Sequence, residues 1–135
     1  MKKIQISLLL ITAIFSTMAF SEVAVIVHPS NGASLSKADI TALFLGKKKA
    51  FPGGSSAVPI VLNDATTDEF NSKLLGKSAS QLKSYWSKLV FTGKANPPKA
   101  VSADEMIQLI KSNPNMIGFI DSSKVTTDVK VISQH

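Results

Sequence analysis

Apolar runs bounded by Gly, Pro, Ser and Asn divide the chain after residue 21 into short segments of strand and helix. The β-branched runs 23–27 and 58–62 are typical of buried strands, and the second begins with a proline at its second position. Two further runs, 116–120 and 129–132, have the same character and are separated by a turn-like stretch. The pattern therefore predicts four short strands.

Capping residues and apolar spacing predict helices between these strands. Ser36, Ser78 and Ser102 are each followed three positions later by Asp, Gln or Glu, which is typical of a capping box at a helix start. Another helix is expected from Asp68, with acids in its first turn, and Gly76 supplies its stop. The chain thus alternates between strands and helices along most of its length.

One predicted helix, residues 78–89, carries the chain's two large polar aromatics. Leu82, Tyr85, Trp86 and Leu89 recur at three- and four-residue spacing. Such spacing places them on one side of the helix, and we expect the aromatic pair to face a core and not to form a stacking platform for bases. After this helix, residues 91–98 are expected to form a loop.

Alternation of strands and helices predicts an α/β fold with a mostly parallel sheet flanked by helices on both faces. If cleavage follows Ser21, then 114 residues remain (135 − 21). This length suits one compact domain with its own core. We therefore expect a single domain over residues 22–135.

The first 21 residues have the pattern of a secretory signal peptide. Lys2 and Lys3 precede an apolar run, residues 4–20, and Ala19-Phe20-Ser21 supplies small residues at a plausible cleavage point. The run is marginal in length for a membrane span and no stop-transfer pattern follows it, so a cleaved signal is favoured over an anchor. No cysteine is available for a lipid anchor or a disulfide. A soluble periplasmic or secreted protein is expected.

Charge gives a mild preference for anions. Removing Lys2 and Lys3 lowers the net charge from +6 to +4, and every positive charge is lysine. Without arginine, an anion site must use lysine, hydroxyls or backbone N–H groups in place of the bidentate guanidinium. The run Lys47-Lys48-Lys49 is interpreted as solvated surface, and no nucleic-acid partner is predicted.

Two loops are candidate ligand sites, because ligands of α/β sheets bind beyond the carboxyl ends of strands. They are residues 28–34, after the first strand, and residues 63–67, after the second, and both lead toward helix starts that favour anions. We favour the second. Its candidate binding residues are Asn63, Asp64, Thr66 and Thr67. The alternative is that Thr66 and Thr67 only cap the helix and that Asp64 only forms an Asx turn.

Thr92 and Gly93 are further candidates, because this loop is able to approach a ligand through its backbone; an ordinary loop is the alternative.

Catalysis finds little support. His28 precedes a proline and His135 ends the chain, so neither offers metal-ligand spacing or an obvious nucleophile partner. The acid pairs fall in first turns of predicted helices, where the helix dipole explains them. We expect no enzyme, no metal and no cofactor.

Several segments resemble the phosphate ABC transporter substrate-binding protein family. Residues 36–47, containing Phe44-Leu45-Gly46-Lys47, resemble a segment of that family of the form D-I-x-x-I-F-x-G-K, and residues 105–120 resemble a helix followed by a P-G-A-I-G-Y-type strand. Residues 68–77 and 85–94 resemble short, stand-alone members of that family. The resemblance covers nearly all of the chain after residue 21.

The resemblance implies a type II periplasmic binding-protein fold, in which two α/β lobes close over an oxyanion, and this chain has the length of about one lobe. In full-length members a loop of the form R-S-D-G-S-G-T contacts phosphate. The corresponding stretch here is residues 62–67, which lack the arginine and both glycines but keep Asp64, Thr66 and Thr67.

Two classes of function remain open. One is a periplasmic solute-binding protein for phosphate or a similar oxyanion, feeding an ABC transporter. The other is a periplasmic adaptor or sensory accessory that binds no ligand and docks on a membrane transporter, porin or receptor. A homodimer would let a single lobe complete a clamp.

Overall fold

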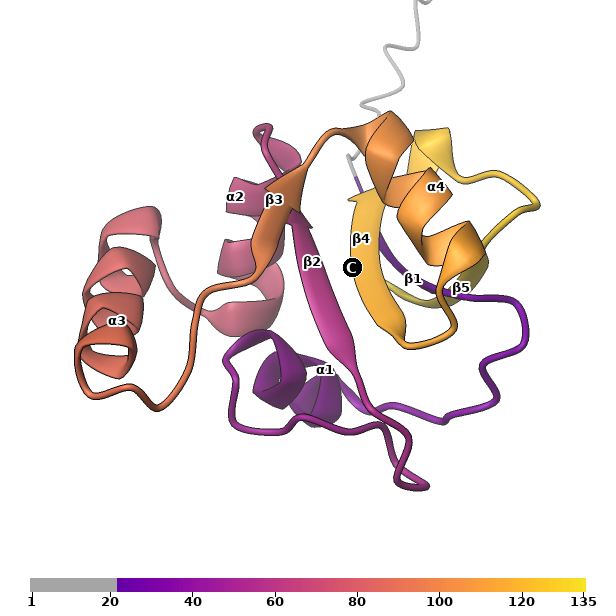
Figure 1. The fold of residues 1–135 in the computed structure, drawn as a ribbon. Coiled ribbons are helices and arrows are strands. Elements are labelled where there is room, and N and C mark those ends of the chain that lie inside the picture. The colour runs from indigo at the N-terminus through magenta and orange to yellow at the C-terminus, as the bar shows by residue number, and fades with distance from the viewer. Residues whose placement is uncertain (1–21) are drawn as a thin grey trace, which may run out of the picture.

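The computed structural model describes residues 22–135, which fold around one five-stranded sheet of order β3-β2-β4-β1-β5 (Figure 1). The predicted signal peptide, residues 1–21, lies outside the described residues. In chain order the elements are β1 (Val23–Val27), α1 (Lys37–Phe44), β2 (Val58–Leu62), α2 (Thr66–Phe70), the π-helical η1 (Asn71–Leu75), α3 (Ala79–Phe91), β3 (Lys99–Val101), α4 (Ala103–Ser112), β4 (Met116–Asp121), the 3-10 helix η2 (Ser122–Lys124) and β5 (Lys130–Gln134).

The sheet is mixed. β2 pairs in parallel with β3 and β4, whereas β1 pairs antiparallel with both β4 and β5. Four strands therefore run in one direction and β1, placed between β4 and β5, runs against them. The predicted α/β class is confirmed. The description "mostly parallel" fits the strand directions, but two of the four pairings are antiparallel.

Helices cover both faces of the sheet, as predicted. On one face, Phe119 of β4 stacks on Phe70 of α2 with ring centroids 3.9 Å apart, and Phe44 of α1 lies 4.7 Å from Phe70. The next residue along β4, Gly118, points to the opposite face, where a Cβ atom would meet Met106 of α4 and Ile60. The inner strand β1 is covered on both sides, and all five of its residues are 0% exposed.

The predicted helix starts are confirmed in position. Ser36 and Ser78 each form a complete capping box at α1 and α3. At α4 the Ser102 hydroxyl accepts from the Glu105 N–H at 3.2 Å, and the Glu105 carboxylate lies 3.8 Å from Lys99 Nζ. The helix expected from Asp68 begins at Thr66, continues as η1 and ends at Gly76, whose φ is +61°.

Helix α3 stands apart from the sheet (Figure 1) and has no buried residue. The prediction that Tyr85 and Trp86 face a core is wrong, because both are only half-buried. The Tyr85 hydroxyl instead donates to the Leu45 carbonyl at 2.6 Å, which ties α3 to the end of α1. Helical spacing shows that a helix has one apolar side, but not how deeply that side is covered.

Strand β3 was not predicted. It is a three-residue edge strand whose first two residues, Lys99 and Ala100, are exposed. Prolines precede it and it lacks an apolar run, so it carries little sequence signal. None of the helices in residues 22–135 is long and apolar enough to cross a membrane.

Candidate functional site

The carboxyl ends of β2, β3 and β4 meet at one edge of the sheet, because these strands are parallel (Figure 1). A surface pocket of about 510 Å³ lies at this edge, which we call the strand-end pocket. It is lined by Asn63, Asp64, Ser102, Ala103, Asp104, Ile107, Lys124 and Thr126. The predicted alternative, the loop of residues 28–34, leaves the opposite edge because β1 is antiparallel, and it does not line this pocket.

The loop after β2 is held by its own hydrogen bonds. The Asn63 N–H donates to the Val101 carbonyl at 2.9 Å, which joins the ends of β2 and β3. Asp64 Oδ1 accepts from the Thr66 N–H at 2.9 Å, and the Asp64 carbonyl accepts from the Thr67 N–H at 3.1 Å. Two N–H groups at the start of α2 are therefore already engaged by Asp64.

Thr66 and Thr67 are half-buried and do not line the strand-end pocket. The Thr67 hydroxyl donates to the Leu62 carbonyl at 2.5 Å. Of the four candidates in this loop, the structure brings only Asn63 and Asp64 to the pocket, and Asp64 forms the Asx turn that the sequence offered as the alternative. A binding role for Thr66 and Thr67 stays a prediction.

Helix α4 contributes the opposite wall. Its cap, Ser102, lies directly after β3, and the N–H groups of Ala103 and Asp104 fall in the first turn, where no intrahelical acceptor is available to them. The positive end of the helix dipole favours an anion here. β3, Ser102 and α4 thus form a second strand–loop–helix arrangement, which lies beside the one formed by β2, the Asn63 loop and α2.

Charge in the strand-end pocket is mixed. Asp64 and Asp104 supply two carboxylates and Lys124 supplies one ammonium group, and all three residues are exposed. Two carboxylates repel a fully ionised ligand. They accept hydrogen bonds from a ligand that still carries a proton. The pocket is therefore suited to a protonated oxyanion more than to one without protons.

Thr92 and Gly93 lie elsewhere. Thr92 caps the C-terminal end of α3, where its hydroxyl donates to the Lys88 carbonyl at 2.9 Å, and Gly93 follows with φ +69°. Gly93 lines a separate pocket that shares no residue with the strand-end pocket. The structure does not bring these two candidates together with Asn63 and Asp64.

Sequence reasoning missed the second half of the pocket, namely Ser102 to Asp104, Ile107, Lys124 and Thr126. If β3 had been recognised directly before the Ser102 cap, the start of α4 would have been expected beside the start of α2. Lys124 and Thr126 follow β4, which is parallel to β2, so their loop emerges at the same edge. These residues meet Asn63 and Asp64 in the pocket only because of the strand order, which a single sequence does not reveal.

Neither histidine belongs to the strand-end pocket. His28 Nδ1 accepts from the Ser30 N–H at 3.0 Å within a local turn, and the His135 ring lies 3.1 Å from the Ser133 hydroxyl. Within residues 22–135 no three or more His, Asp or Glu residues gather in a way that could hold a metal ion.

No family model and no curated protein matches this sequence. Several solved structures are similar in fold, among them these three. A protein described as a phosphate ABC transporter substrate-binding protein, with bound phosphate, from Clostridium perfringens has a TM-score of 0.63 and 20% identity, over 83% of this chain and 44% of that one. An ABC-type phosphate transport receptor from Vibrio cholerae has a TM-score of 0.55 and 16% identity, over 83% and 45%. PstS from Borrelia burgdorferi has a TM-score of 0.60 and 12% identity, over 84% and 47%.

The chain therefore spans less than half the length of the solved structures that it matches. At these identities the similarity shows the fold. The predicted resemblance to phosphate ABC transporter substrate-binding proteins is confirmed at that level: residues 22–135 have the fold of one part of such a protein.

Proposed function

We propose that this protein is a periplasmic solute-binding protein that holds phosphate or a similar oxyanion non-covalently at the strand-end pocket and passes it to an ABC transporter. The observation that carries the proposal is the place of this pocket, beyond the carboxyl ends of parallel strands, in a fold that resembles a protein solved with bound phosphate. The role is binding and delivery, not catalysis.

In this proposal the free N–H groups at the start of α4, the Asn63 amide and the Lys124 ammonium group donate to phosphate oxygens. Asp64 and Asp104 accept from the protons that phosphate retains near neutral pH. Sulfate has no such proton and meets only repulsion from the carboxylates. We therefore expect the pocket to select phosphate over sulfate.

Delivery to a transporter requires the protein to be in the periplasm. Lys2, Lys3 and the apolar run 4–20 support export through a cleaved signal peptide. The periplasmic localisation is part of the proposal, and so is cleavage of the signal peptide between residues 21 and 22.

The test is thermal unfolding of the mature protein with phosphate or with sulfate at constant ionic strength. A ligand present at about 100 times its Kd adds about 2.7 kcal/mol to the free energy of unfolding, which raises Tm by several degrees in a domain of this size. Lys124→Gln is expected to reduce the rise with phosphate. Lys111→Gln, which changes the same charge outside the pocket, is the control. Equal effects of phosphate and sulfate, or no effect of millimolar phosphate, would reject the proposal.

A second function is favoured by one observation: Asp64 already occupies N–H groups of α2 that an anion would otherwise use. In this alternative the chain is an adaptor or sensory accessory without a ligand, and it docks on a membrane transporter, porin or receptor. It predicts that neither oxyanion changes Tm.

A homodimer extends the first proposal. The polar residues of the strand-end pocket are exposed, so a bound anion would remain open to water on one side. A second copy placed over this edge would exclude that water and strengthen each hydrogen bond.

A further inference from the structure

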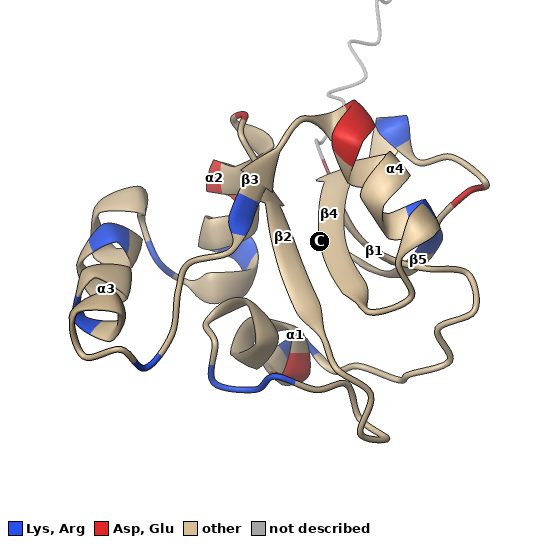
Figure 2. Ribbon diagram, in the orientation of Figure 1, with Lys and Arg blue, Asp and Glu red and all other residues tan. Residues whose placement is uncertain are grey.

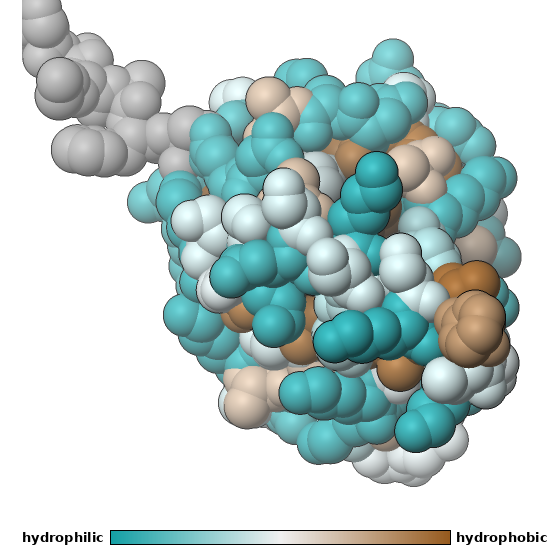
Figure 3. Space-filling model, turned by 90° about the vertical axis from the view of Figure 1, so that its left-hand side faces the viewer, coloured by the Kyte–Doolittle hydropathy of each residue, from teal (hydrophilic) through white to brown (hydrophobic). Residues whose placement is uncertain are grey.

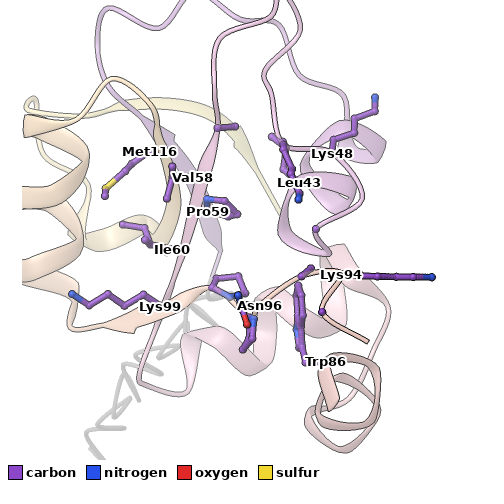
Figure 4. A pocket seen from close by; sticks show the side chains of 17 residues that line it. Leu43, Lys48, Val58, Pro59, Ile60, Trp86, Lys94, Asn96, Lys99 and Met116 are labelled. Carbon is purple, nitrogen blue, oxygen red and sulfur yellow. The ribbon is translucent and has the colours of Figure 1, made fainter. Parts of the chain in front are cut away.

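A second pocket, of about 500 Å³, lies between α1, α3 and the first half of β2 (Figure 4). We call it the Trp86 groove. Its apolar wall includes Leu43, Val58, Ile60, Trp86, Pro97 and Met116. This volume falls within the range of small-molecule sites, which are largely apolar with a few polar groups. The groove shares no residue with the strand-end pocket, so it is independent of the proposed phosphate site.

Local geometry holds Trp86 in the groove. Gly46 has φ +71°, and a Cβ atom at this position would lie 3.4 Å from the Trp86 ring. A glycine therefore allows the ring to lie close to the end of α1. The neighbouring Tyr85 ring lies 5.2 Å from Trp86, and its hydroxyl bonds the Leu45 carbonyl. The wall formed by α3 is thus fixed to α1 by specific contacts.

Lysines surround the Trp86 groove, and no acid lines it. Lys48 is paired with Asp39 at 3.0 Å and Lys99 with Glu105 at 3.8 Å, whereas Lys49 and Lys94 make no ion pair with any described residue. In Figure 4 the ammonium groups of Lys48, Lys94 and Lys99 point away from the centre of the groove. The floor is therefore apolar, and the positive charge lies around the rim on long, flexible side chains.

The charge pattern around the groove is one-sided. Helix α3 and strand β3 carry lysines and no acid, and the one acid of α1, Asp39, is paired with Lys48 (Figure 2). On the face occupied by α3, apolar surface appears between hydrophilic side chains (Figure 3). An anionic group held at the mouth would have no nearby unpaired carboxylate to oppose it.

From this arrangement we propose that the Trp86 groove binds a small organic anion that has an apolar body and one acidic group. The body lies against Trp86, Val58 and Ile60, and the acidic group sits at the mouth, where the flexible side chains of Lys49 and Lys94 turn toward it on binding. Inorganic phosphate does not fit this site, because the floor offers little beyond the Asn96 amide to hold its oxygens.

The test uses a matched pair of fluorescent probes, 8-anilinonaphthalene-1-sulfonate and the uncharged N-phenyl-1-naphthylamine, added to the folded mature protein. Trp86 is the only tryptophan, so quenching of its emission and energy transfer to the probe report binding of the probe to the protein. We expect saturable binding of the sulfonate at one site per chain, tighter than binding of the neutral probe. Inorganic phosphate should not compete.

Two pairs of variants locate the site. Asn96→Phe fills the groove from an exposed position and should abolish sulfonate binding, whereas Gln108→Phe, an exposed position on α4 outside the groove, should not. Replacing both Lys49 and Lys94 by Gln should weaken sulfonate binding about threefold to tenfold and leave the neutral probe unaffected. Replacing both Lys88 and Lys111 by Gln is the charge-matched control. All variants are first checked for an unchanged Tm.

Several outcomes would overturn the proposal. One is the absence of saturable binding, and another is sulfonate binding that survives Asn96→Phe. A third is binding that Phe91→Ser abolishes: Phe91 is 93% exposed in a neighbouring hollow that also includes Trp86 and Pro97, so this result would place the probe in that hollow and not in the groove. If the Lys49/Lys94 and Lys88/Lys111 replacements weaken sulfonate binding equally, the sulfonate is attracted to the basic surface in general and does not occupy a specific site.

Discussion

At the scale of single residues, Gly118 is the glycine with the least room for a side chain. It lies in β4, and a Cβ atom there would collide with Met106 Sδ and approach Ile60 Cγ1 within 3.3 Å. The Gly118→Ala variant is expected to lower the free energy of unfolding by about 1–3 kcal/mol, because the close packing of α4 on the sheet leaves no space. Urea denaturation measures the change.

The matched control is Gly32→Ala. No atom lies within 4 Å of a Cβ atom built at Gly32, and this residue does not need positive φ. Its free energy of unfolding should be unchanged within error or slightly higher. If the two alanine variants change the free energy of unfolding equally, α4 does not pack closely on the sheet at Gly118.

Residue identity predicted part of the strand-end pocket. Asn63 and Asp64 were found because they directly follow a recognisable strand, and the same reasoning offered Asp64 as a turn former. Sequence alone does not decide between a carboxylate that binds a ligand and one that closes its own turn, because both use the same atoms. Ser102 was recognised as a cap, but its approach to Asn63 depends on the pairing of β2 with β3.

At the scale of elements, the start of α1 makes the protein sensitive to acid. The backbone N–H of Ser36, the Lys48 ammonium group and the Ser36 hydroxyl lower the pKa of Asp39 from 3.8 to about 2. A folded-state pKa below the unfolded one means that the carboxylate adds stability above pH 3.8, and that this stability is lost as the pH falls toward 2.

Asp39→Asn should therefore flatten the dependence of stability on pH across this interval, measured by urea denaturation at a series of pH values. Asp128→Asn is the control, since the Asp128 carboxylate makes only a 3.8 Å ion pair with Lys111. If Asp39→Asn leaves the slope as steep as in the unmodified protein, the capping box of α1 does not hold its carboxylate in the way described.

Most elements could be predicted from sequence, because capping serines and apolar runs report local conformation. The orientation of β1 could not, since a strand buried on both faces has the same apolar pattern in either direction. For this reason the sequence does not show that residues 28–34 leave the edge opposite the strand-end pocket. The π-helical turn in η1 and the exposure of α3 also depend on neighbours distant in sequence.

At the scale of the whole molecule, the strand-end pocket lies at the same edge as the start of β1 and the end of β5. Val23 and His135 exchange backbone hydrogen bonds of 2.8 and 3.0 Å, and Val23 pairs with Asp121 at the end of β4. The edge that presents Asn63, Asp104 and Lys124 is therefore also the edge where β1 begins and β5 ends.

This arrangement predicts that phosphate binding and self-association are linked. If a second copy covers the strand-end pocket, phosphate must favour the dimer, and the dimer must bind phosphate more tightly by the same factor. In sedimentation velocity, phosphate but not sulfate should raise the dimer fraction, and apparent phosphate affinity should increase with protein concentration. Because the edge carries both carboxylates and Lys124, cross-subunit pairing should weaken as salt screens it. A ligand-bound form that stays monomeric at every concentration would refute the homodimer while leaving phosphate binding intact.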